Sequence, residues 1–202
     1  MRFALREIER ENKKVKTIRC DNAGENRKLK EILDLEGFNI KFEFTAPYTP
    51  QQNGVVERAF ATLYGRVRAM LNGAGFDKRL REYLWAECAS TATMLQNSII
   101  KKKGEKSAYE EYCGRKNKVL HHLRTFGETG VVKDNKKKLH SNLEDRGIVC
   151  LLLGYAADHP EDTYRMLNLK TKKVVITRDV KWLNKMHNKI SNEKRIVAVT
   201  HK

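Results

Sequence analysis

The chain has 202 residues, of which 33% are charged, and its formal charge is +16 at pH 7. This length allows a useful hydrophobic core, which excludes the class of small domains that need disulfides or metals to fold. The positive charge indicates a polyanionic partner, most often nucleic acid, because Lys and Arg displace counterions from phosphates. The excess is concentrated in residues 101–202, which hold 24 Lys and Arg against 12 Asp and Glu. An anionic membrane surface is the weaker alternative, because no strongly amphipathic basic helix stands out.

The cysteines show no C-x-x-C pair and no zinc-type spacing, so we expect reduced, mostly packed thiols in an intracellular protein. The four residues are Cys20, Cys88, Cys113 and Cys150. His121 and His122 have no cysteine nearby, and we expect no zinc site there. The sequence shows no signal peptide and no apolar run long enough for a membrane span, so it predicts neither secretion nor membrane insertion.

The first part of the sequence alternates helical and strand patterns. Amphipathic spacing predicts helices over residues 2–12 and 28–36, and apolar alternation predicts strands over 15–20 and 39–44. The first strand ends immediately before Asp21. Ligands commonly gather at the carboxyl ends of strands in α/β sheets, which makes Asp21 a candidate site residue.

A polar loop and the helix after it present the second candidate acid. Pro47 and Pro50 exclude a helix through the loop, and Gly54 permits a tight turn before an apolar-periodic run. Glu57 is therefore expected in the first turn of a long helix. One interpretation is structural, because acids at helix N-termini are stabilised by the helix dipole in any protein. The other is that Glu57 binds a metal ion together with Asp21, which lies 36 positions earlier.

Two long helices follow, over residues 55–71 and from Asp77 to about Leu95. Their apolar faces are expected to form core, and Trp85 is most simply a core residue. Three arginines, Arg58, Arg66 and Arg68, lie elsewhere on the first helix. They form either an ordinary solvated face, which we favour, or a track that contacts DNA.

The composition changes after the two long helices. A basic connector over 101–106 leads to the capping box Ser107-Ala108-Tyr109-Glu110, which predicts a short helix that ends at Gly114. Beyond about residue 122, β-rich runs predict a small barrel. These runs cover residues 130–133, 147–154, 163–169 and 173–182.

Asp21 and Glu57 offer only oxygen ligands, the type that Mg²⁺ and Mn²⁺ bind, and neighbours poor in His and Cys argue against zinc. In a strongly basic protein, the chemistry that these ligands indicate is phosphoryl transfer at a two-metal site. Two side chains would hold a pair of divalent ions weakly, so such a site needs further carboxylates.

Six short runs make the sequence similar to the integrase of copia-type LTR retrotransposons, over roughly Val15 to Trp182. The runs are C-D-N-A-G-E-N, P-Y-T-P-Q-Q-N-G-V-V-E-R, Y-L-W-A-E-C, S-A-Y-E-E-Y-C-G, H-H-L-R-T-F-G and L-L-L-G-Y. The 35 residues between Asp21 and Glu57 agree with the D, D, E pattern of that family. The chain departs from the family at Cys20, Ala23 and Asn26, where Ser, Gly and an aromatic residue are usual.

The resemblance implies an α/β fold: an N-terminally truncated ribonuclease H-like core over 1–118, a small all-β SH3-like barrel over 119–184, and a basic tail over 185–202. It implies a polynucleotidyl transferase that trims a DNA end and joins its 3′-hydroxyl to target DNA with Mg²⁺ or Mn²⁺. Asp21 would be the second acid and Glu57 the third, while the first acid is expected upstream of this sequence. We therefore expect the chain alone to be inactive. A non-catalytic nucleic-acid-binding remnant and a protein-interaction scaffold are the alternatives.

The implied partners are DNA, as retroelement ends and target, and further copies of the chain. No membrane is implied, and integration would take place in the nucleus. The side chains that the sequence offers for DNA contact lie in the polar loop, on the long helix, in the connector and in basic turns. They are Tyr48, Gln51, Gln52, Asn53, Arg58, Arg66, Lys101, Lys102, Lys103, Lys136, Lys137, Lys138, Lys172 and Lys173. For the turn lysines, an ordinary solvated turn remains an equal alternative.

Overall fold

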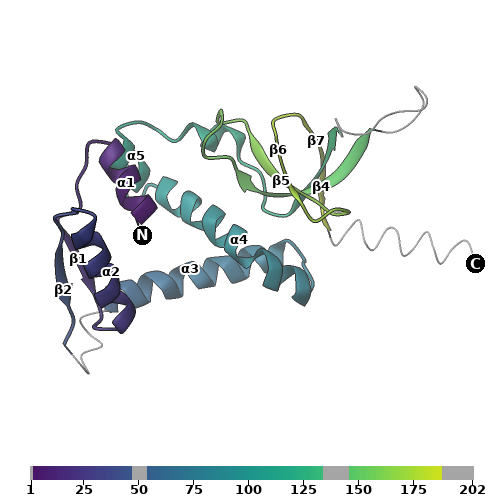
Figure 1. Ribbon diagram of the computed structural model, residues 1–202. Coiled ribbons are helices and arrows are strands. Elements are labelled where there is room, and N and C mark those ends of the chain that lie inside the picture. The colour runs from purple at the N-terminus through teal and green to yellow at the C-terminus, as the bar shows by residue number, and fades with distance from the viewer. Residues whose placement is uncertain (1, 47–53, 134–145, 188–202) are drawn as a thin grey trace, which may run out of the picture. The chain divides into compact units, whose positions relative to one another are not determined.

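The computed structural model describes residues 2–46, 54–133 and 146–187 (Figure 1). Contacts divide the chain into two compact units, Met1–Ala61 and Thr62–Lys202, and each unit is described by itself. This division falls inside a helix, whereas the sequence-based division after residue 118 follows the resemblance to integrases. The latter division stays a prediction.

The first unit is a β-α-β arrangement preceded by a helix. Helix α1 covers Arg2–Arg10, strand β1 Thr17–Cys20, helix α2 Gly24–Leu35 and strand β2 Lys41–Phe44. The two strands pair in parallel, with Thr17 opposite Lys41 and Cys20 opposite Phe44. Parallel neighbours need a crossover connection, which α2 provides. The alternating elements that the sequence predicts here are confirmed.

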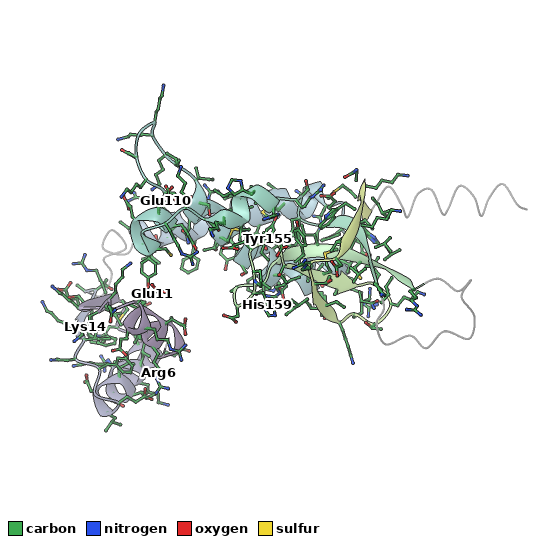
Figure 2. The ribbon with its side chains drawn as sticks, turned by 90° about the horizontal axis from the view of Figure 1, so that it is seen from above. Arg6, Glu11, Lys14, Glu110, Tyr155 and His159 are labelled. Carbon is green, nitrogen blue, oxygen red and sulfur yellow. The ribbon has the colours of Figure 1, made fainter. Side chains whose placement is uncertain are left out.

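A small core holds this unit together. Leu5 from α1, Leu33 from α2 and Ile40 before β2 are buried against one another. The outer surface is charged, and Arg6, Glu11 and Lys14 stand on it with exposed side chains (Figure 2). Burial of apolar side chains in this cluster stabilises the unit, because each fully buried aliphatic side chain contributes about 1.5–3 kcal/mol.

Helices make up the first half of the second unit, which begins inside α3 (Gly54–Gly73). Helix α4 covers Lys78–Ser98, and the Asp77 carboxylate caps it by accepting a hydrogen bond of 2.8 Å from the Leu80 amide. The capping box is confirmed on helix α5 (Ala108–Cys113), which Gly114 ends in the left-handed conformation, and the 3₁₀ turn η2 (Lys118–His122) follows. These helix ends agree with the sequence-based predictions because a helix cap depends only on side chains within a few residues of the helix end.

A five-stranded antiparallel sheet makes up the rest of the described second unit (Figure 1). Its strands lie in the order β6-β5-β4-β3-β7. The last strand that the structure describes, β7, therefore pairs with β3, the first strand of this sheet. They cover β3 Glu128–Lys133, β4 Gly147–Tyr155, β5 Tyr164–Asn168, β6 Val174–Thr177 and β7 Val180–Met186. The β-rich run predicted over 173–182 is therefore two strands, with a turn at Arg178 and Asp179.

Strand β4 is buried on both faces. Leu151 and Leu153 pack into a core shared with Val67 of α3 and Leu84 of α4. The alternate residues, including Leu152, pack on the other side of the sheet in a separate core. Because successive side chains of a strand point to opposite faces, one strand joins the helical layer to the sheet interior.

Polar contacts also tie α4 to the sheet. The Thr91 hydroxyl donates to the Leu153 carbonyl at 2.6 Å, and Arg165 of β5 pairs with Glu87 at 2.7 Å. A Cβ added at Gly154, whose φ is +152°, would lie 2.4 Å from the Thr91 hydroxyl oxygen. Only glycine lets β4 approach the helix this closely without displacing its neighbour.

The expectation that the apolar faces of α3 and α4 are core is correct only in part. Val67, Leu71 and Leu84 are buried, but Phe60 is 53% exposed and Trp85 51% exposed. The core prediction for Trp85 is wrong, because half of its side-chain surface is exposed and the residue lines a surface pocket together with Arg68 and Arg81. Helical period identifies a face of a helix, but it does not say how much of its length is packed.

The thiols are free, as expected. Cys88 and Cys150 are fully buried, and burial raises the pKa of each to about 11. Burial, followed by the neighbouring Asp21 carboxylate, also raises the pKa of the half-buried Cys20. None of the helices within the described ranges is long and apolar enough to span a bilayer.

Candidate functional site

Asp21 follows the carboxyl end of β1 directly, and its carboxylate is held in place from one side. Its Oδ1 accepts a hydrogen bond of 2.6 Å from the Asn26 side-chain amide and a long one of 3.4 Å from the Ala23 amide. The Asn26 amide also donates to the Asp21 carbonyl at 3.2 Å. Asp21 Oδ2 accepts no hydrogen bond from the residues that the structure describes, so it remains available to a ligand.

Asn26 can reach Asp21 because α2 begins earlier than its apolar period suggests. The helix starts at Gly24, four residues before the predicted start, which places Asn26 in its first turn and half-buried. Arg27 adds to the order by donating to the Asn22 side-chain oxygen at 2.8 Å. In the sequence, Asn26 stands out only as a departure from the integrase family, and no sequence pattern indicates its contact with Asp21.

Glu57 lies in the first turn of α3, as the sequence predicts, and its side chain is exposed. The loop residues Tyr48, Gln51, Gln52 and Asn53 lie outside the described residues. Over the described ranges, no three His, Cys, Asp or Glu side chains form a group that could hold a metal ion. The positions of Asp21 and Glu57 on their elements are confirmed, whereas their convergence on one ion remains a prediction.

Glu43 lies on the strand beside β1, but its carboxylate is already in use. It forms ion pairs with Arg19 at 2.9 Å across the strand pair and with Lys41 at 3.0 Å. Its hydrogen bonds to Lys41, and then to Arg19, lower the pKa of the Glu43 carboxyl. Glu43 is thus occupied in cross-strand pairing, which makes it a poor additional metal ligand beside Asp21.

The basic residues proposed from the sequence lie in different places. Arg58 and Lys101–Lys103 are exposed, with Lys102 near Glu105 at 3.7 Å. Arg66 is half-buried, and its Nη1 is buried without a hydrogen-bond partner in the described part of the chain. Lys172 and Lys173 are exposed beside the turn between β5 and β6. The predicted contacts Lys136, Lys137 and Lys138 fall in the segment 134–145, outside the described residues.

Comparison with known proteins adds sequence relatives to this geometry. Residues 130–195 match the family described as the retroviral polymerase SH3-like domain. The Retrovirus-related Pol polyprotein from transposon TNT 1-94 of Nicotiana tabacum is 34% identical over 176 residues, which cover 86% of this chain. The chain spans only 13% of the length of that polyprotein.

Among solved structures, a chain in the cryo-EM structure of the simian T-cell lymphotropic virus intasome in complex with PP2A regulatory subunit B56 gamma superposes with a TM-score of 0.40. The superposition covers 89% of this chain and 61% of that chain, at 14% sequence identity. This similarity is too loose to establish a common fold. The sequence matches, in contrast, confirm the predicted relationship: the chain is related to a segment of a retrotransposon Pol polyprotein, and its C-terminal part carries a retroviral polymerase SH3-like domain.

Proposed function

We propose that the chain forms part of a retrotransposon integrase of the copia type, a metal-dependent polynucleotidyl transferase that processes and joins DNA ends. The observation that carries the proposal is the placement of two acids in the first unit. Asp21 follows a strand of a parallel β-α-β unit, and Glu57 opens helix α3 with the family spacing between them. The sequence relationship to a Pol polyprotein supports it.

The proposed core of this enzyme is ribonuclease H-like. A parallel β-α-β unit is the building block of open α/β sheets, in which ligands bind beyond the carboxyl ends of the strands. Cys20 ends β1 and Asp21 comes next, so the candidate acid stands at the edge of the sheet where such sites form.

The donors at Asp21 and Glu57 suit Mg²⁺ or Mn²⁺, because these hard ions prefer carboxylate oxygens. When bound, such an ion would stabilise charge on a phosphoryl group and activate an attacking hydroxyl or water. The contribution of Asn26 is to fix Asp21 Oδ1 at 2.6 Å, which leaves Oδ2 for a ligand. Glu57 would supply the second side chain from the first turn of α3.

DNA is the proposed macromolecular partner, and the charge of +16 supports it. The exposed candidates Arg58, Lys101, Lys102, Lys103 and Lys173 would contact phosphates, which position a protein on DNA without reading its sequence. Self-association and action in the nucleus follow from the integrase resemblance and are part of the same proposal.

A second candidate function is a non-catalytic nucleic-acid-binding remnant, which the formal charge of +16 supports equally well. Both candidates share the basic surface and differ in chemistry. Two carboxylate side chains would hold a pair of divalent metal ions only weakly. We therefore propose that the 202-residue polypeptide does not join DNA by itself.

Joining of a labelled DNA end tests the enzyme proposal. We expect no product from the purified 202-residue polypeptide in Mg²⁺ or Mn²⁺. In a longer polypeptide that supplies an additional Asp-bearing strand, we expect joining that is lost in Asp21→Ala and in Glu57→Gln. Product formation by the shorter polypeptide that disappears in Asp21→Ala would contradict the inactivity. A longer polypeptide whose joining survives both changes would contradict the assigned roles.

Filter binding of duplex DNA across a salt series tests the partner. We expect the logarithm of the binding constant to fall linearly with the logarithm of salt concentration, with a slope of about −0.9 for each phosphate neutralised. Replacing Lys101, Lys102 and Lys103 together by Gln should make the slope shallower by about 2–3 if each lysine contacts one phosphate. Absence of salt-dependent binding would instead favour the protein-interaction scaffold.

A further inference from the structure

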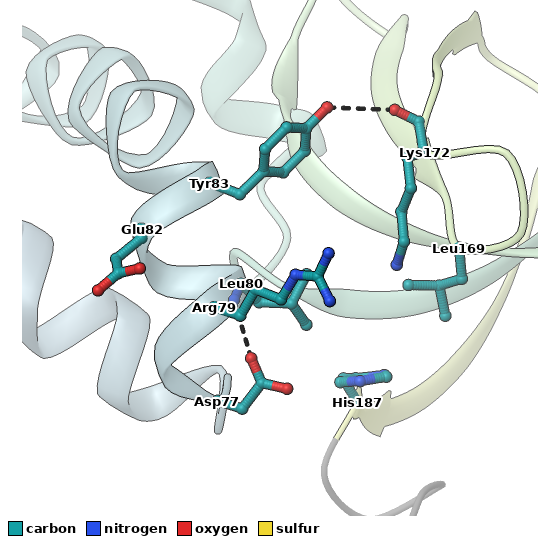
Figure 3. A pocket seen from close by; sticks show the side chains of 8 residues that line it. All are labelled: Asp77, Arg79, Leu80, Glu82, Tyr83, Leu169, Lys172 and His187. Atoms are coloured by element: carbon teal, nitrogen blue, oxygen red, sulfur yellow. Dashed lines mark hydrogen bonds between the residues drawn. The ribbon is translucent and has the colours of Figure 1, made fainter.

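A pocket with a volume of about 830 Å³ lies between the start of α4, the turn between β5 and β6, and the end of β7 (Figure 3). All of these elements belong to the second unit. The volume falls within the usual range of ligand pockets, which is about 300–1,000 Å³. The lining side chains are Asp77, Arg79, Leu80, Glu82, Tyr83, Leu169, Lys172 and His187.

Lys172 is held at this pocket by an unusual backbone conformation. Its φ is +57°, a left-handed value that is uncommon for a residue with a side chain. Asn168, which is buried, fixes the turn by accepting the Lys170 and Thr171 amides on its side chain at 2.9 and 3.1 Å. The Lys172 amide bonds to the Asn168 carbonyl at 2.9 Å, and Tyr83 of α4 donates to the Lys172 carbonyl at 3.3 Å. The backbone of Lys172 is therefore fixed by hydrogen bonds at both its amide and its carbonyl.

Two cations and two carboxylates line the pocket, and the two cations lie close to each other. Arg79 and Lys172 project into the same space (Figure 3), and neither forms an ion pair with any residue in the described ranges. The Asp77 carboxylate caps α4 by accepting the Leu80 amide at 2.8 Å, and Glu82 points away from the two cations and lies 4.0 Å from Lys78 (Figure 3). An anionic group is the ligand that the neighbouring Arg79 and Lys172 side chains could bind together.

Aromatic and apolar surfaces complete the pocket. Tyr83 is 60% exposed, and its hydroxyl is anchored, so its ring presents a fixed face. The His187 ring packs edge-on against Phe76 with centroids 6.2 Å apart, and Leu80 and Leu169 supply apolar contact. Burial lowers the pKa of His187, an effect that Asp77 opposes and Lys172 reinforces. Aromatic rings beside cations suit a flat aromatic ligand that carries negative charge.

We propose that this pocket binds one unpaired nucleotide of a nucleic-acid strand, with its base against the rings of Tyr83 and His187 and its phosphate on Arg79 and Lys172. The inference rests on the proposed function for the nature of the partner. It goes further by naming a site in the second unit and a single-stranded form of the ligand. An unpaired base can stack on an aromatic ring whatever its identity, so the site would prefer single strands without reading sequence.

The test is binding of a labelled oligo-dT single strand, and of a blunt duplex, to the full 202-residue chain. We expect Tyr83→Leu to weaken single-strand binding about tenfold, and duplex binding to change less than about twofold. Trp85→Leu is the matched control, because Trp85 is an exposed aromatic residue on the same helix outside the pocket. Tyr83→Phe keeps the ring and should bind almost as wild type, which separates stacking from the hydroxyl contact.

Lys172→Asn tests the phosphate contact, because Asn tolerates the left-handed conformation and removes the charge. We expect the single-strand salt slope to become shallower by about 0.7, and Lys170→Asn on the same turn to leave it unchanged. If the wild-type chain binds DNA and neither Tyr83→Leu nor Lys172→Asn changes this binding, the nucleotide-binding role of the pocket is wrong, but the proposed function stands. A wild-type chain that binds neither single strands nor duplex would overturn both this inference and the proposed function.

Discussion

Replacing Gly127 by alanine is expected to lower the free energy of unfolding of the second unit by about 3 kcal/mol or more. Gly127 has a φ of +80°, and a Cβ there would lie 2.6 Å from the Ala74 Cβ and 2.9 Å from the Phe76 ring. Both neighbours are buried, with exposures of 1% and 3%, so neither can move aside without disturbing the core. Steric overlap therefore adds to the conformational cost of a left-handed alanine.

Gly114→Ala is the matched control for this change. Gly114 also has a positive φ, of +70°, but no atom outside its own chain neighbourhood lies within 4 Å of the place that a Cβ would take. Its substitution should cost only about 1–2 kcal/mol. Urea unfolding followed by tryptophan fluorescence measures both, because Trp85 and Trp182 lie in the second unit. Equal losses in the two variants would show that the contact with Ala74 and Phe76 does not limit stability.

Replacing Asp21 by asparagine is expected to abolish selective binding of Mn²⁺ at the candidate site. Paramagnetic broadening of amide NMR signals by substoichiometric Mn²⁺ can locate the ion. We expect broadening of both residues 20–26 and residues 55–59 in the wild type, and loss of both in Asp21→Asn. Removal of a charged oxygen ligand leaves too few donors for a hard cation. Asp34→Asn, an exposed acid on α2, is the control and should change nothing.

The same experiment decides whether Asp21 and Glu57 converge. If only the amide signals of residues 20–26 broaden, Glu57 does not bind the same ion. The structural interpretation of Glu57, an acid stabilised by the helix dipole, would then hold. Asn26→Leu removes the 2.6 Å hydrogen bond to Asp21 while keeping a side chain of similar size. We expect it to weaken Mn²⁺ binding about tenfold, the effect of losing a group that orients a ligand. Unchanged affinity would show that Asn26 only closes the turn.

Much of the local structure could be predicted from the sequence. The caps at Asp77, Ser107 and Gly114 were predictable because they depend on a few neighbouring residues, and the structure has each of them. Asp21 after a strand and Glu57 in a first helical turn were predictable for the same reason. Position along an element follows from local pattern, but the distance between two elements does not.

Other features depended on contacts that no local pattern contains. The start of α2 at Gly24 was missed because its first turn is polar and shows no apolar period. The break between β6 and β7 was missed because Arg178 and Asp179 interrupt a β-rich run without Gly or Pro, and Thr177 closes it by accepting the Asp179 amide at 3.1 Å. The pocket was not predictable, since Arg79 and Lys172 are 93 positions apart.

The run Leu151-Leu152-Leu153-Gly154-Tyr155 has a different meaning once β4 is seen between two cores. Leu151 and Leu153 serve the helical side, Leu152 the opposite side, and Gly154 the close approach of Thr91. This run, which contributes to the resemblance to integrases, is therefore explained by core packing, and none of its side chains has a proposed catalytic role. Sequence similarity at β4 is thus a marker of shared architecture, and the proposed activity has to be tested at Asp21, Asn26 and Glu57.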